Sequence, residues 1–422
     1  MDNAVKSRYV AFNILKDILF GQKTLDGIFD RQLFYQSLSH TDKQFVRMLV
    51  LTVLRRWGQL KFLVNQCLDK PLPEKRRDIL VVLALGVAQL YYLNTPPHAA
   101  TDTAVQLTRV IKQSAFTKLV NAVLRSFVRK GKTLKEPSVL LNYPEWLMDD
   151  WKQNYGEEVA EKMLLSLMDS GYLDITVKTN PQEWAERWNG VVLNTGTVRC
   201  PYQGDVALMD GYADGLWWVQ EASASIPAQL FDDLQNKRVA DLCAAPGGKT
   251  AQLACRRAFV DAYDISEKRL MRLRENMKRL KLEDYVQVKC QDVLTITEKQ
   301  VYDAVLLDAP CSATGTIRRH PDLLYHRTKE DVQRLTQIQS ALLQKAIDLL
   351  KPNGQLVYST CSLMRDENES VVQQALLNNK NLERVVLNKK WQPFLNANGA
   401  IQVLPTMGQD GFYAVLLYKK NT

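Results

Sequence analysis

The sequence has few of the residues that metal-binding or disulfide-stabilised proteins need. Its 422 residues include four histidines and seven cysteines, and the cysteines form no CxxC pair and no zinc-like spacing with the histidines. We therefore expect no metal site. An odd number of cysteines without a disulfide framework indicates reduced thiols in a cytoplasmic protein.

Long hydrophobic runs and targeting segments are also missing. The amino-terminal stretch MDNAVKSRYVAFNILKDILF lacks the unbroken apolar region of a secretion signal. The longest apolar stretch, residues 79–93, contains Gln89 and is too short to span a bilayer, so it predicts a buried helix. There is no low-complexity tract and no internal repeat. We expect a cytoplasmic protein with no membrane partner.

The positive charge is concentrated in the first third of the chain. Residues 1–135 carry 22 Lys and Arg against 9 Asp and Glu, whereas the other residues carry 33 against 37. The densest positive group is Arg125, Arg129, Lys130 and Lys132. A single charge run is usually a solvated helix surface, but a basic segment on a near-neutral body is typical of nucleic-acid binding.

Sequence patterns divide the chain into three regions. Residues 1–135 favour helices throughout, and the breaker Asn94-Thr95-Pro96-Pro97 ends the buried one. Residues 136–235 predict a small α+β linking domain, with a helix pair and strands at 174–179, 191–193 and, more weakly, 206–209. From 236 to 422 strands and helices alternate, which is typical of an α/β domain. Its expected strands are 239–242, 258–263, 286–288, 304–307 and 355–358, followed by a hairpin of 401–404 and 411–418.

A glycine-rich loop, DLCAAPGGKT at residues 241–250, follows the first of these α/β strands. Paired glycines let backbone amides approach a ligand closely, although the loop matches neither GxGxxG nor the GxxxxGK[ST] phosphate loop. Asp264 ends the next strand and Asp292 follows the third, where carboxylates can accept the hydroxyls of a ribose or reach an adenine amino group. Each acid alone is more often a turn or N-cap residue. Together they predict a nucleoside cofactor rather than a triphosphate, which such acids would repel.

Two cysteines, Cys311 and Cys361, lie in the short turns DAPC and STCS after two apolar runs. In an open parallel sheet, the residues just past the carboxyl ends of strands converge on the binding crevice. A lone free cysteine is usually a small buried hydrophobe. Two thiols at two strand ends beside a glycine-rich loop favour covalent chemistry instead.

The motifs DLCAAPGGKT, DIS, DAPCSATG and YSTCS resemble those of the S-adenosylmethionine-dependent RNA cytosine-C5 methyltransferases, over residues 217–412. LALGVAQLYYL and Pro97-His98-Ala99-Ala100 resemble the NusB-type domain of one subgroup, the RsmB type, which acts on bacterial 16S rRNA. The resemblance implies an all-α NusB-like RNA-binding domain (1–135), the linking domain (136–235) and a Rossmann-like catalytic domain (236–422). It also implies S-adenosyl-L-methionine as cofactor and 16S rRNA as partner, free or in early subunit assembly. We expect a monomer.

The resemblance assigns roles to particular residues. It makes Cys361 the nucleophile that adds to cytosine C6, and Cys311 the group that assists elimination and release. Asp308 would hydrogen-bond the N3/N4 edge of the base near the methionine end of the cofactor. Lys249 either orients the base or faces solvent. The implied cofactor-binding set is Cys243, Ala244, Ala245, Pro246, Gly247, Gly248, Lys249, Asp264, Asp292 and Asp308.

Other features are less settled by the sequence. The run Arg318-Arg319-His320-Pro321-Asp322 is expected to contact RNA or to shape the site. Glu221 stands where the family usually has aspartate, and Lys178 replaces a common arginine, which leaves fine substrate contacts open. Alternatives are a methyltransferase for another RNA such as tRNA, a non-catalytic RNA-binding assembly factor, and a thiol redox enzyme.

Overall fold

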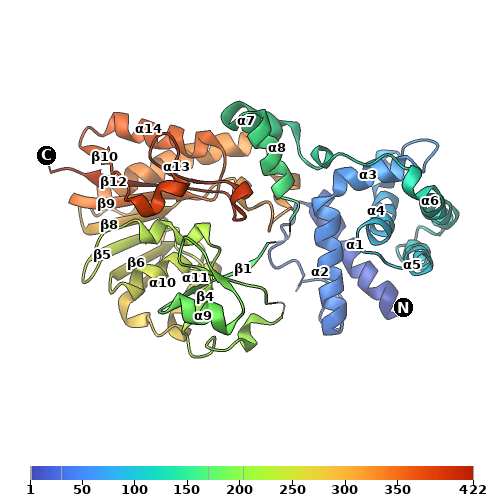
Figure 1. Ribbon diagram of the computed structural model, residues 1–422, viewed down its shortest axis with the longest axis horizontal. Helices are drawn as coiled ribbons and strands as arrows, with labels where there is room; N and C mark the ends of the chain where they lie inside the picture. The colour runs from blue at the N-terminus through green and yellow to red at the C-terminus, as the bar shows by residue number, and fades with distance from the viewer. Residues whose placement is uncertain (1, 30, 170, 203, 422) are drawn as a thin grey trace. The chain divides into compact units, whose positions relative to one another are not determined.

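The computed structural model describes residues 2–29, 31–169, 171–202 and 204–421, without the side chain of Lys132. The chain forms two compact units (Figure 1), one of residues 1–168 with 317–327 and one of residues 169–316 with 328–422. The segment 136–235 is shared between the two units. The three-domain division with boundaries at 135/136 and 235/236 therefore stays a prediction.

The first unit is helical and is built around a central helix, α4 (Arg77–Tyr91). Residue 79 and residues 81–89 of α4 are buried, because the helix is apolar around its whole circumference and packs against α1, α2, α3, α5 and α6. The expectation of a buried helix at 79–93 is confirmed as far as Gln89; the helix ends at Tyr91, and residues 90–93 are partly or fully exposed. The other helices of this unit are α1 (Asn3–Gly21), α2 (His40–Arg55), α3 (Trp57–Asn65), α5 (Pro97–Val110), α6 (Thr117–Lys130), α7 (Glu145–Tyr155), α8 (Glu157–Ser166) and α12 (Leu323–His326).

The segment 317–327, which contains α12, is bound to this helical unit. The Arg55 guanidinium donates to the Arg318 carbonyl at 2.9 Å, and the Leu25 amide donates to Asp322 Oδ2 at 2.8 Å. The Tyr325 hydroxyl donates to the Leu54 carbonyl. Arg318 and Asp322 are buried by these contacts. No sequence pattern indicates that this run packs among the amino-terminal helices, and its contact with RNA stays a prediction.

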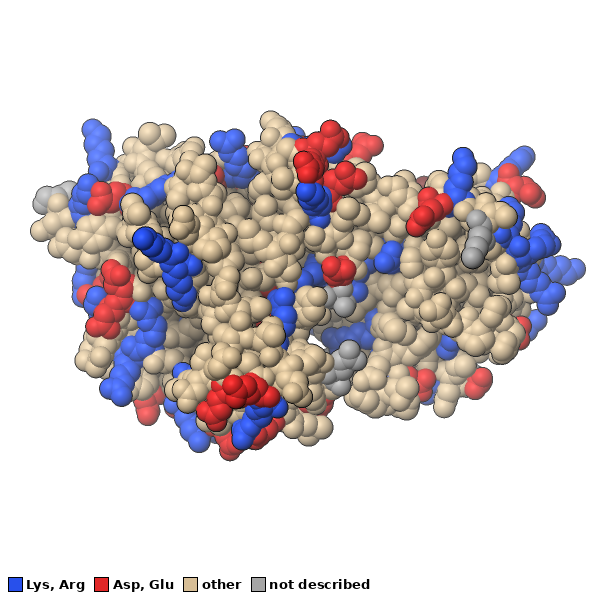
Figure 2. Space-filling view, viewed as in Figure 1, with Lys and Arg blue, Asp and Glu red and all other residues tan. Residues whose placement is uncertain are grey.

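Basic side chains cover the outer face of α6. Val120, Val123, Leu124 and Phe127 are buried on the inner face, while Lys118, Arg125, Arg129 and Lys130 are exposed on the outer face. Figure 2 shows Lys and Arg side chains gathered over this helix. The side chain of Lys132, expected in the same group, lies outside the described residues. An amphipathic helix of this kind presents several cations to the phosphates of a nucleic acid.

The second unit holds two sheets. A small antiparallel sheet has the order β2-β3-β1-β4, and a large mixed sheet has the order β10-β12-β9-β8-β5-β6-β7, with β11 paired to β12. The strands of the small sheet are β1 (Leu173–Val177), β2 (Val191–Val192), β3 (Val198–Cys200) and β4 (Trp217–Val219). Those of the large sheet are β5 (Arg238–Leu242), β6 (Phe259–Asp264), β7 (Val286–Cys290), β8 (Tyr302–Asp308), β9 (Leu350–Thr360), β10 (Leu382–Arg384), β11 (Ile401–Val403) and β12 (Phe412–Lys419).

The large sheet is parallel from β7 through β9 and closes with the antiparallel strand β12. From the central strand β5 the chain proceeds through β6 and β7 on one side and through β8 and β9 on the other. The carboxyl ends of β5 and β8 therefore flank a topological switch point, where open α/β sheets bind ligands. The helices of this unit are α9 (Pro181–Arg187), α10 (Gly248–Cys255), α11 (Glu267–Arg279), α13 (Lys329–Leu349) and α14 (Glu369–Asn378).

The fold class is confirmed as a helical amino-terminal part followed by an α/β domain of Rossmann-like topology. The closing hairpin is also confirmed, since β11 pairs with β12 in antiparallel register. The strand expected at 206–209 is wrong, because residues Val206–Leu208 form a 3₁₀ turn. The Asp205 side chain accepts the Ala207 amide at 3.0 Å and so stabilises a turn in place of an extended strand.

A glycine in α3 provides a test of packing in the helical unit. A Cβ at Gly58 would lie 1.7 Å from the Leu141 carbonyl oxygen, which is backbone and has little room to move. We predict that Gly58→Ala lowers the free energy of unfolding by about 3 kcal/mol, although alanine has the higher helix propensity. Denaturant unfolding followed by circular dichroism measures the change.

Gly21→Ala is the matched control at the end of α1. The nearest atoms to a Cβ there lie 3.9 Å away, so its free energy of unfolding should stay within about 1 kcal/mol of wild type. Equal stability of the Gly58→Ala variant and the control would contradict the close approach of α3 to residue 141.

Candidate active site

The two cysteines are brought together by the pairing of β8 with β9. Asp308 at the end of β8 lies opposite Ser359 in parallel register, and the Ala309 amide donates to the Ser359 carbonyl at 2.9 Å. The chain leaves both strands at the same edge of the sheet. The Sγ atoms of Cys311 and Cys361 consequently lie 3.5 Å apart, in hydrogen-bond contact.

Both sulfurs face one cavity of about 480 Å³ within the second unit. Its walls combine thiols, carboxylates, one guanidinium and apolar side chains. The lining residues are Cys243, Asp264, Ile265, Arg269, Gln291, Asp292, Val293, Leu294, Asp308, Ala309, Pro310, Cys311, Ala313, Ile338, Leu342 and Cys361. The structure thus joins the expected cysteines to the acids at the ends of β6, β7 and β8.

The glycine-rich loop contributes Cys243 to the cavity wall, and the rest of the loop fixes its shape. Cys243 adopts a left-handed backbone with φ of 64°. The Ala244 amide donates to the Tyr263 carbonyl at 2.9 Å, which attaches the loop to β6. Gly247 has φ of 101°, and a Cβ there would lie 2.8 Å from Leu273 Cγ. Only glycine adopts this positive φ readily and also has no Cβ to clash with Leu273 on the neighbouring helix.

Asp264 and Asp292 both line the cavity and both cap backbone amides. Asp264, which is buried, accepts the Ser266 amide at 2.9 Å and the Ala245 amide at 3.3 Å. Asp292 accepts the Leu294 amide at 3.0 Å. Asp264 and Asp292 can therefore stabilise a turn and bind a ligand at the same time, because a carboxylate offers about four acceptor positions.

Lys249 and Asp308 form an ion pair beside the cysteines. The Lys249 ammonium donates to Asp308 Oδ2 at 2.7 Å, and the Ser359 hydroxyl donates to Asp308 Oδ1 at 3.0 Å. The Lys249 side chain is 11% exposed, so it does not face solvent. Its ammonium also lies 5.2 Å from the centre of the Phe412 ring. Asp308 is thus held by two donors and keeps acceptor positions for a ligand.

Burial changes the protonation of groups around the loop. It raises the pKa of Asp241, at the end of β5, to about 7, because a single hydrogen bond from Thr250 only partly compensates for the lost water. Burial, together with the nearby charges of Asp264, Asp308 and Asp241, raises the pKa of the Cys243 thiol to about 12. The hydrogen bond with Cys361, burial and nearby negative charge raise the pKa of Cys311. Cys243 and Cys311 are therefore thiols at neutral pH.

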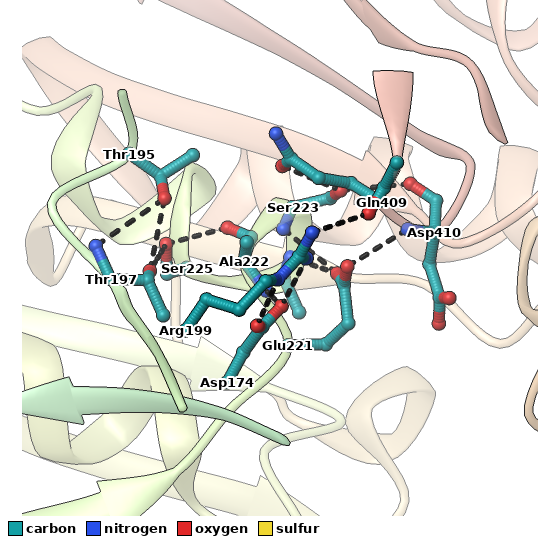
Figure 3. Close-up of polar contacts among 12 residues, drawn as sticks. Asp174, Thr195, Thr197, Arg199, Glu221, Ala222, Ser223, Ser225, Gln409 and Asp410 are labelled. Atoms are coloured by element: carbon teal, nitrogen blue, oxygen red, sulfur yellow. Dashed lines mark hydrogen bonds and ion pairs between the residues drawn. The ribbon is translucent and has the colours of Figure 1, made fainter. Parts of the chain in front are cut away.

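A buried polar network connects the small sheet to the loop that precedes β12 (Figure 3). Arg199 makes a bidentate ion pair with Asp174 at 2.7 and 2.9 Å and donates to the Gly408 carbonyl. Glu221 accepts the Asp410 amide at 2.8 Å and the Ser223 amide at 2.8 Å. Glu221 is therefore a cap inside this network and is absent from the cavity wall.

The loop after Asp410 touches the cysteine loops through backbone hydrogen bonds. The Gly411 amide donates to the Gly315 carbonyl at 2.9 Å, and the Gly315 amide donates to the Cys361 carbonyl at 3.0 Å. Lys178, the other departure from the family pattern, donates to the Leu280 carbonyl. Glu221 and Lys178, the two positions that differ from the family pattern, therefore both make hydrogen bonds within the second unit.

Several cavity residues were assigned no role from the sequence, although Ile265 lies within the DIS motif. Ile265, Leu294 and Ile338 supply apolar surface, and Arg269 lies 3.4 Å from Asp264. Ile265 directly follows Asp264, and Leu294 lies two residues after Asp292. This closeness to the two predicted acids is the signal that could have identified them as cavity residues. Ile338, on the long helix α13, had no such signal.

The cavity fits the parts of S-adenosyl-L-methionine. The carboxylates of Asp264 and Asp292 can accept ribose hydroxyls and the adenine amino group, while Ile265, Val293 and Leu294 provide apolar surface for a base. Carboxylates of the cavity also favour the positive charge of a sulfonium. The fold and the cavity define the protein as an S-adenosylmethionine-dependent methyltransferase.

Comparison with known proteins identifies the family. Residues 228–418 match the model of 16S rRNA methyltransferase RsmB/F, and residues 5–129 match the NusB family. The ribosomal RNA small subunit methyltransferase B of Klebsiella pneumoniae is 30% identical over 452 residues, covering 100% of both chains. That of Pasteurella multocida is 33% identical, covering 98% of this chain and 96% of the relative.

A solved structure agrees with this relationship. A methyltransferase homologue from Pyrococcus horikoshii is 28% identical, with a TM-score of 0.55, and covers 69% of this chain and 97% of that one. The chain belongs to the RsmB/F family of 16S rRNA methyltransferases and also carries a NusB-family domain. Within the described parts of the chain, no helix is long and apolar enough to cross a membrane, and no group of side chains is arranged to hold a metal ion.

Asp241 makes stability depend on pH in a defined direction. Its pKa is raised in the folded protein, so the folded state holds the proton more tightly than the unfolded state and loses stability as pH rises from about 4 to about 7. We predict that Asp241→Asn is more stable than wild type above pH 7 by about 4 kcal/mol. Denaturant unfolding without cofactor, measured at a series of pH values, tests this.

Thr250→Val is the matched variant, because it removes the hydroxyl that donates to Asp241 Oδ2 at 2.6 Å. Without this donor the pKa of Asp241 should rise further. The loss of folding stability should therefore continue to a higher pH than in wild type. A stability difference between Asp241→Asn and wild type that does not change between pH 4 and 8 would refute the assignment.

Proposed function

We propose that this protein transfers the methyl group of S-adenosyl-L-methionine to C5 of a cytosine in 16S rRNA, through a covalent bond between Cys361 and C6. The observation that carries the proposal is the pair of sulfurs, 3.5 Å apart, in the wall of the cavity that also holds Asp264, Asp292 and Asp308. The proposed nucleophile, a second thiol and the proposed cofactor-binding acids therefore share one cavity.

Cytosine C5 is a weak nucleophile in the intact aromatic ring. Addition of the Cys361 thiolate to C6 breaks the conjugation and places enamine electron density on C5. The bound cofactor supplies an electrophilic methyl group on its sulfonium. After the transfer a base removes the C5 proton, the C5–C6 double bond forms again, and Cys361 leaves as a thiolate.

The two cysteines have different environments, which supports unequal roles. Cys311 has a raised pKa because of its hydrogen bond with Cys361, burial and neighbouring negative charge. A thiol that keeps its proton is a poor nucleophile, and it can assist elimination by donating that proton to the departing Cys361 sulfur while another base takes the C5 proton. The order of the motifs, with the nucleophile in YSTCS, supports the same assignment.

Asp308 and Lys249 are proposed to hold the base. Asp308, fixed by Lys249 and Ser359, lies in the cavity wall three residues before Cys311. From there a carboxyl group can bond the N3/N4 edge and stabilise the protonation that accompanies thiol addition. Cysteine addition from this cavity also requires an unstacked base, so the target nucleotide lies in a loop or an opened helix.

The helical unit is proposed to bind the phosphates of the RNA. The exposed cations of α6 can bind phosphates whatever the RNA sequence. Specificity would then come from the shape of the RNA and from the base in the cavity. The names of the relatives from K. pneumoniae and P. multocida support small-subunit rRNA as the substrate. The cytoplasm is the expected location, and a monomer is the expected state.

Cysteine variants test the roles of the two sulfurs. With labelled cofactor and unmodified small-subunit RNA, we predict that Cys361→Ala forms no covalent RNA adduct and no product. Cys311→Ala should accumulate an adduct, because release is impaired while attack is not. Denaturing gels and scintillation counting measure adduct and product.

Wild-type protein is the positive control, and nuclease digestion should give labelled 5-methylcytosine. An adduct formed by Cys361→Ala but not by Cys311→Ala would reverse the assigned roles. Failure of the wild type to label naked RNA and partly assembled subunits alike would contradict the proposed function.

A further inference from the structure

A buried glutamate, Glu367, joins the two cysteine loops. It ends a 3₁₀ turn six residues after Cys361, and its side chain is fully inaccessible to solvent. Its carboxylate does not line the cavity and contacts neither sulfur through a hydrogen bond. The groups that it binds are instead the residues that directly follow the cysteines, Ser312 and Ser362.

Glu367 accepts hydrogen bonds from both loops on one carboxylate. Oε1 accepts the Ser312 amide at 2.8 Å, and Oε2 accepts the hydroxyls of Ser312 and Ser362. The two serine hydroxyls lie 3.1 Å apart. Because one oxygen atom holds the serine after each cysteine, a change in the position of the carboxylate must change the separation of the loops.

A glutamine on α13 extends this contact to the other side of Cys311. Gln339 Nε2 donates to Glu367 Oε1 at 3.0 Å and to the Pro310 carbonyl at 2.9 Å. The backbone is thereby fixed on both sides of Cys311. The Tyr358 hydroxyl donates to the Glu367 carbonyl at 2.6 Å, which also attaches the turn to β9.

We propose that Glu367 is a positioning residue that holds the loops of Cys311 and Cys361 at the separation methyl transfer requires. This proposal rests on the proposed function of the two cysteines. Glu367 is not itself a catalytic residue, because it acts on the sulfurs through Ser312, Ser362 and the backbone.

The charge of Glu367 gives the proposal a second consequence. Four donors surround the carboxylate, which is the environment that stabilises a buried negative charge. This charge is one of the causes that raise the pKa of Cys311, after the hydrogen bond with Cys361 and burial. The carboxylate therefore helps to keep Cys311 in its thiol form.

The test compares Glu367→Gln with wild type in the full-length protein. Iodoacetamide alkylation of Cys311 is followed by peptide mass spectrometry across a pH series, without RNA or cofactor. We expect the alkylation midpoint of Cys311 to fall by about one pH unit, since a neutral amide no longer opposes the thiolate. The exposed Cys290 is the internal reference, and its profile should not move.

Kinetics provide the second readout. Glu367→Gln should lower kcat at least tenfold while the KM for S-adenosyl-L-methionine stays within twofold, because the cofactor side of the cavity is untouched. Glu367→Asp, which keeps the charge, should restore the alkylation profile and recover part of kcat. Ser362→Ala should lower kcat without shifting the Cys311 profile, because the charge remains.

Glu369→Gln is the matched control for loss of a buried carboxylate. Glu369 is buried two residues away and binds Tyr413 and Arg384 rather than the cysteine loops. It should reduce thermal stability and leave the Cys311 profile unchanged. If Glu367→Gln does not fold, Ser362→Ala and Glu367→Asp carry the test: both should lower kcat while the Cys311 profile stays as in wild type, and wild-type kcat in both would overturn the proposal.

A folded Glu367→Gln variant with wild-type kcat and an unmoved Cys311 profile would overturn the proposal. So would equal shifts in Glu367→Gln and Glu369→Gln, which would indicate general loosening. The alkylation profile uses no RNA, so it also separates the two hypotheses. A shifted profile in a protein whose wild type methylates no cytosine would reject the proposed function and leave only the effect of Glu367 on the Cys311 thiol in place.

Discussion

The site depends on the parallel pairing of β8 with β9. Asp308 lies opposite Ser359, so the two loops leave the sheet side by side and their sulfurs meet at 3.5 Å. A slip of one residue in this pairing would turn every side chain of the slipped strand to the other face of the sheet. Buried neighbours on both faces of β8 and β9 prevent such a slip, because Val305, Leu306, Leu307, Leu356, Val357 and Tyr358 are all inaccessible to solvent.

Two buried carboxylates near this edge differ in the number of hydrogen bonds that they receive. Asp241 receives one hydrogen bond, from Thr250, and its Oδ1 atom has no partner among the described residues. Burial therefore raises its pKa to about 7. The Glu367 carboxylate, in contrast, receives four hydrogen bonds. Asp241 begins the glycine-rich loop, and Glu367 binds the two cysteine loops. Both acids can therefore affect the site without touching a ligand.

Local patterns in the sequence predicted those parts of the molecule that depend on nearby residues. The apolar runs before Asp308 and Ser359 indicated β8 and β9, and the motifs after them indicated Cys311 and Cys361, because strand periodicity and turn residues are short-range properties. Glu367 escaped prediction because its partners Ser312 and Gln339 are distant in sequence and one glutamate in a turn has no periodicity. The segment 317–327 escaped for the same reason, since its partners Leu25 and Arg55 are about 300 and 260 residues away.

Trapping the covalent intermediate tests the central claim most directly. RNA that contains 5-fluorocytidine at the target site allows attack at C6 and methyl transfer, but the fluorine cannot be removed as a proton, so the adduct persists. Mass spectrometry of the cross-linked peptide identifies the attached cysteine. We expect a methylated base bound to Cys361. A base bound to Cys311, or methyl transfer to normal RNA with no trapped adduct, would contradict the proposed mechanism.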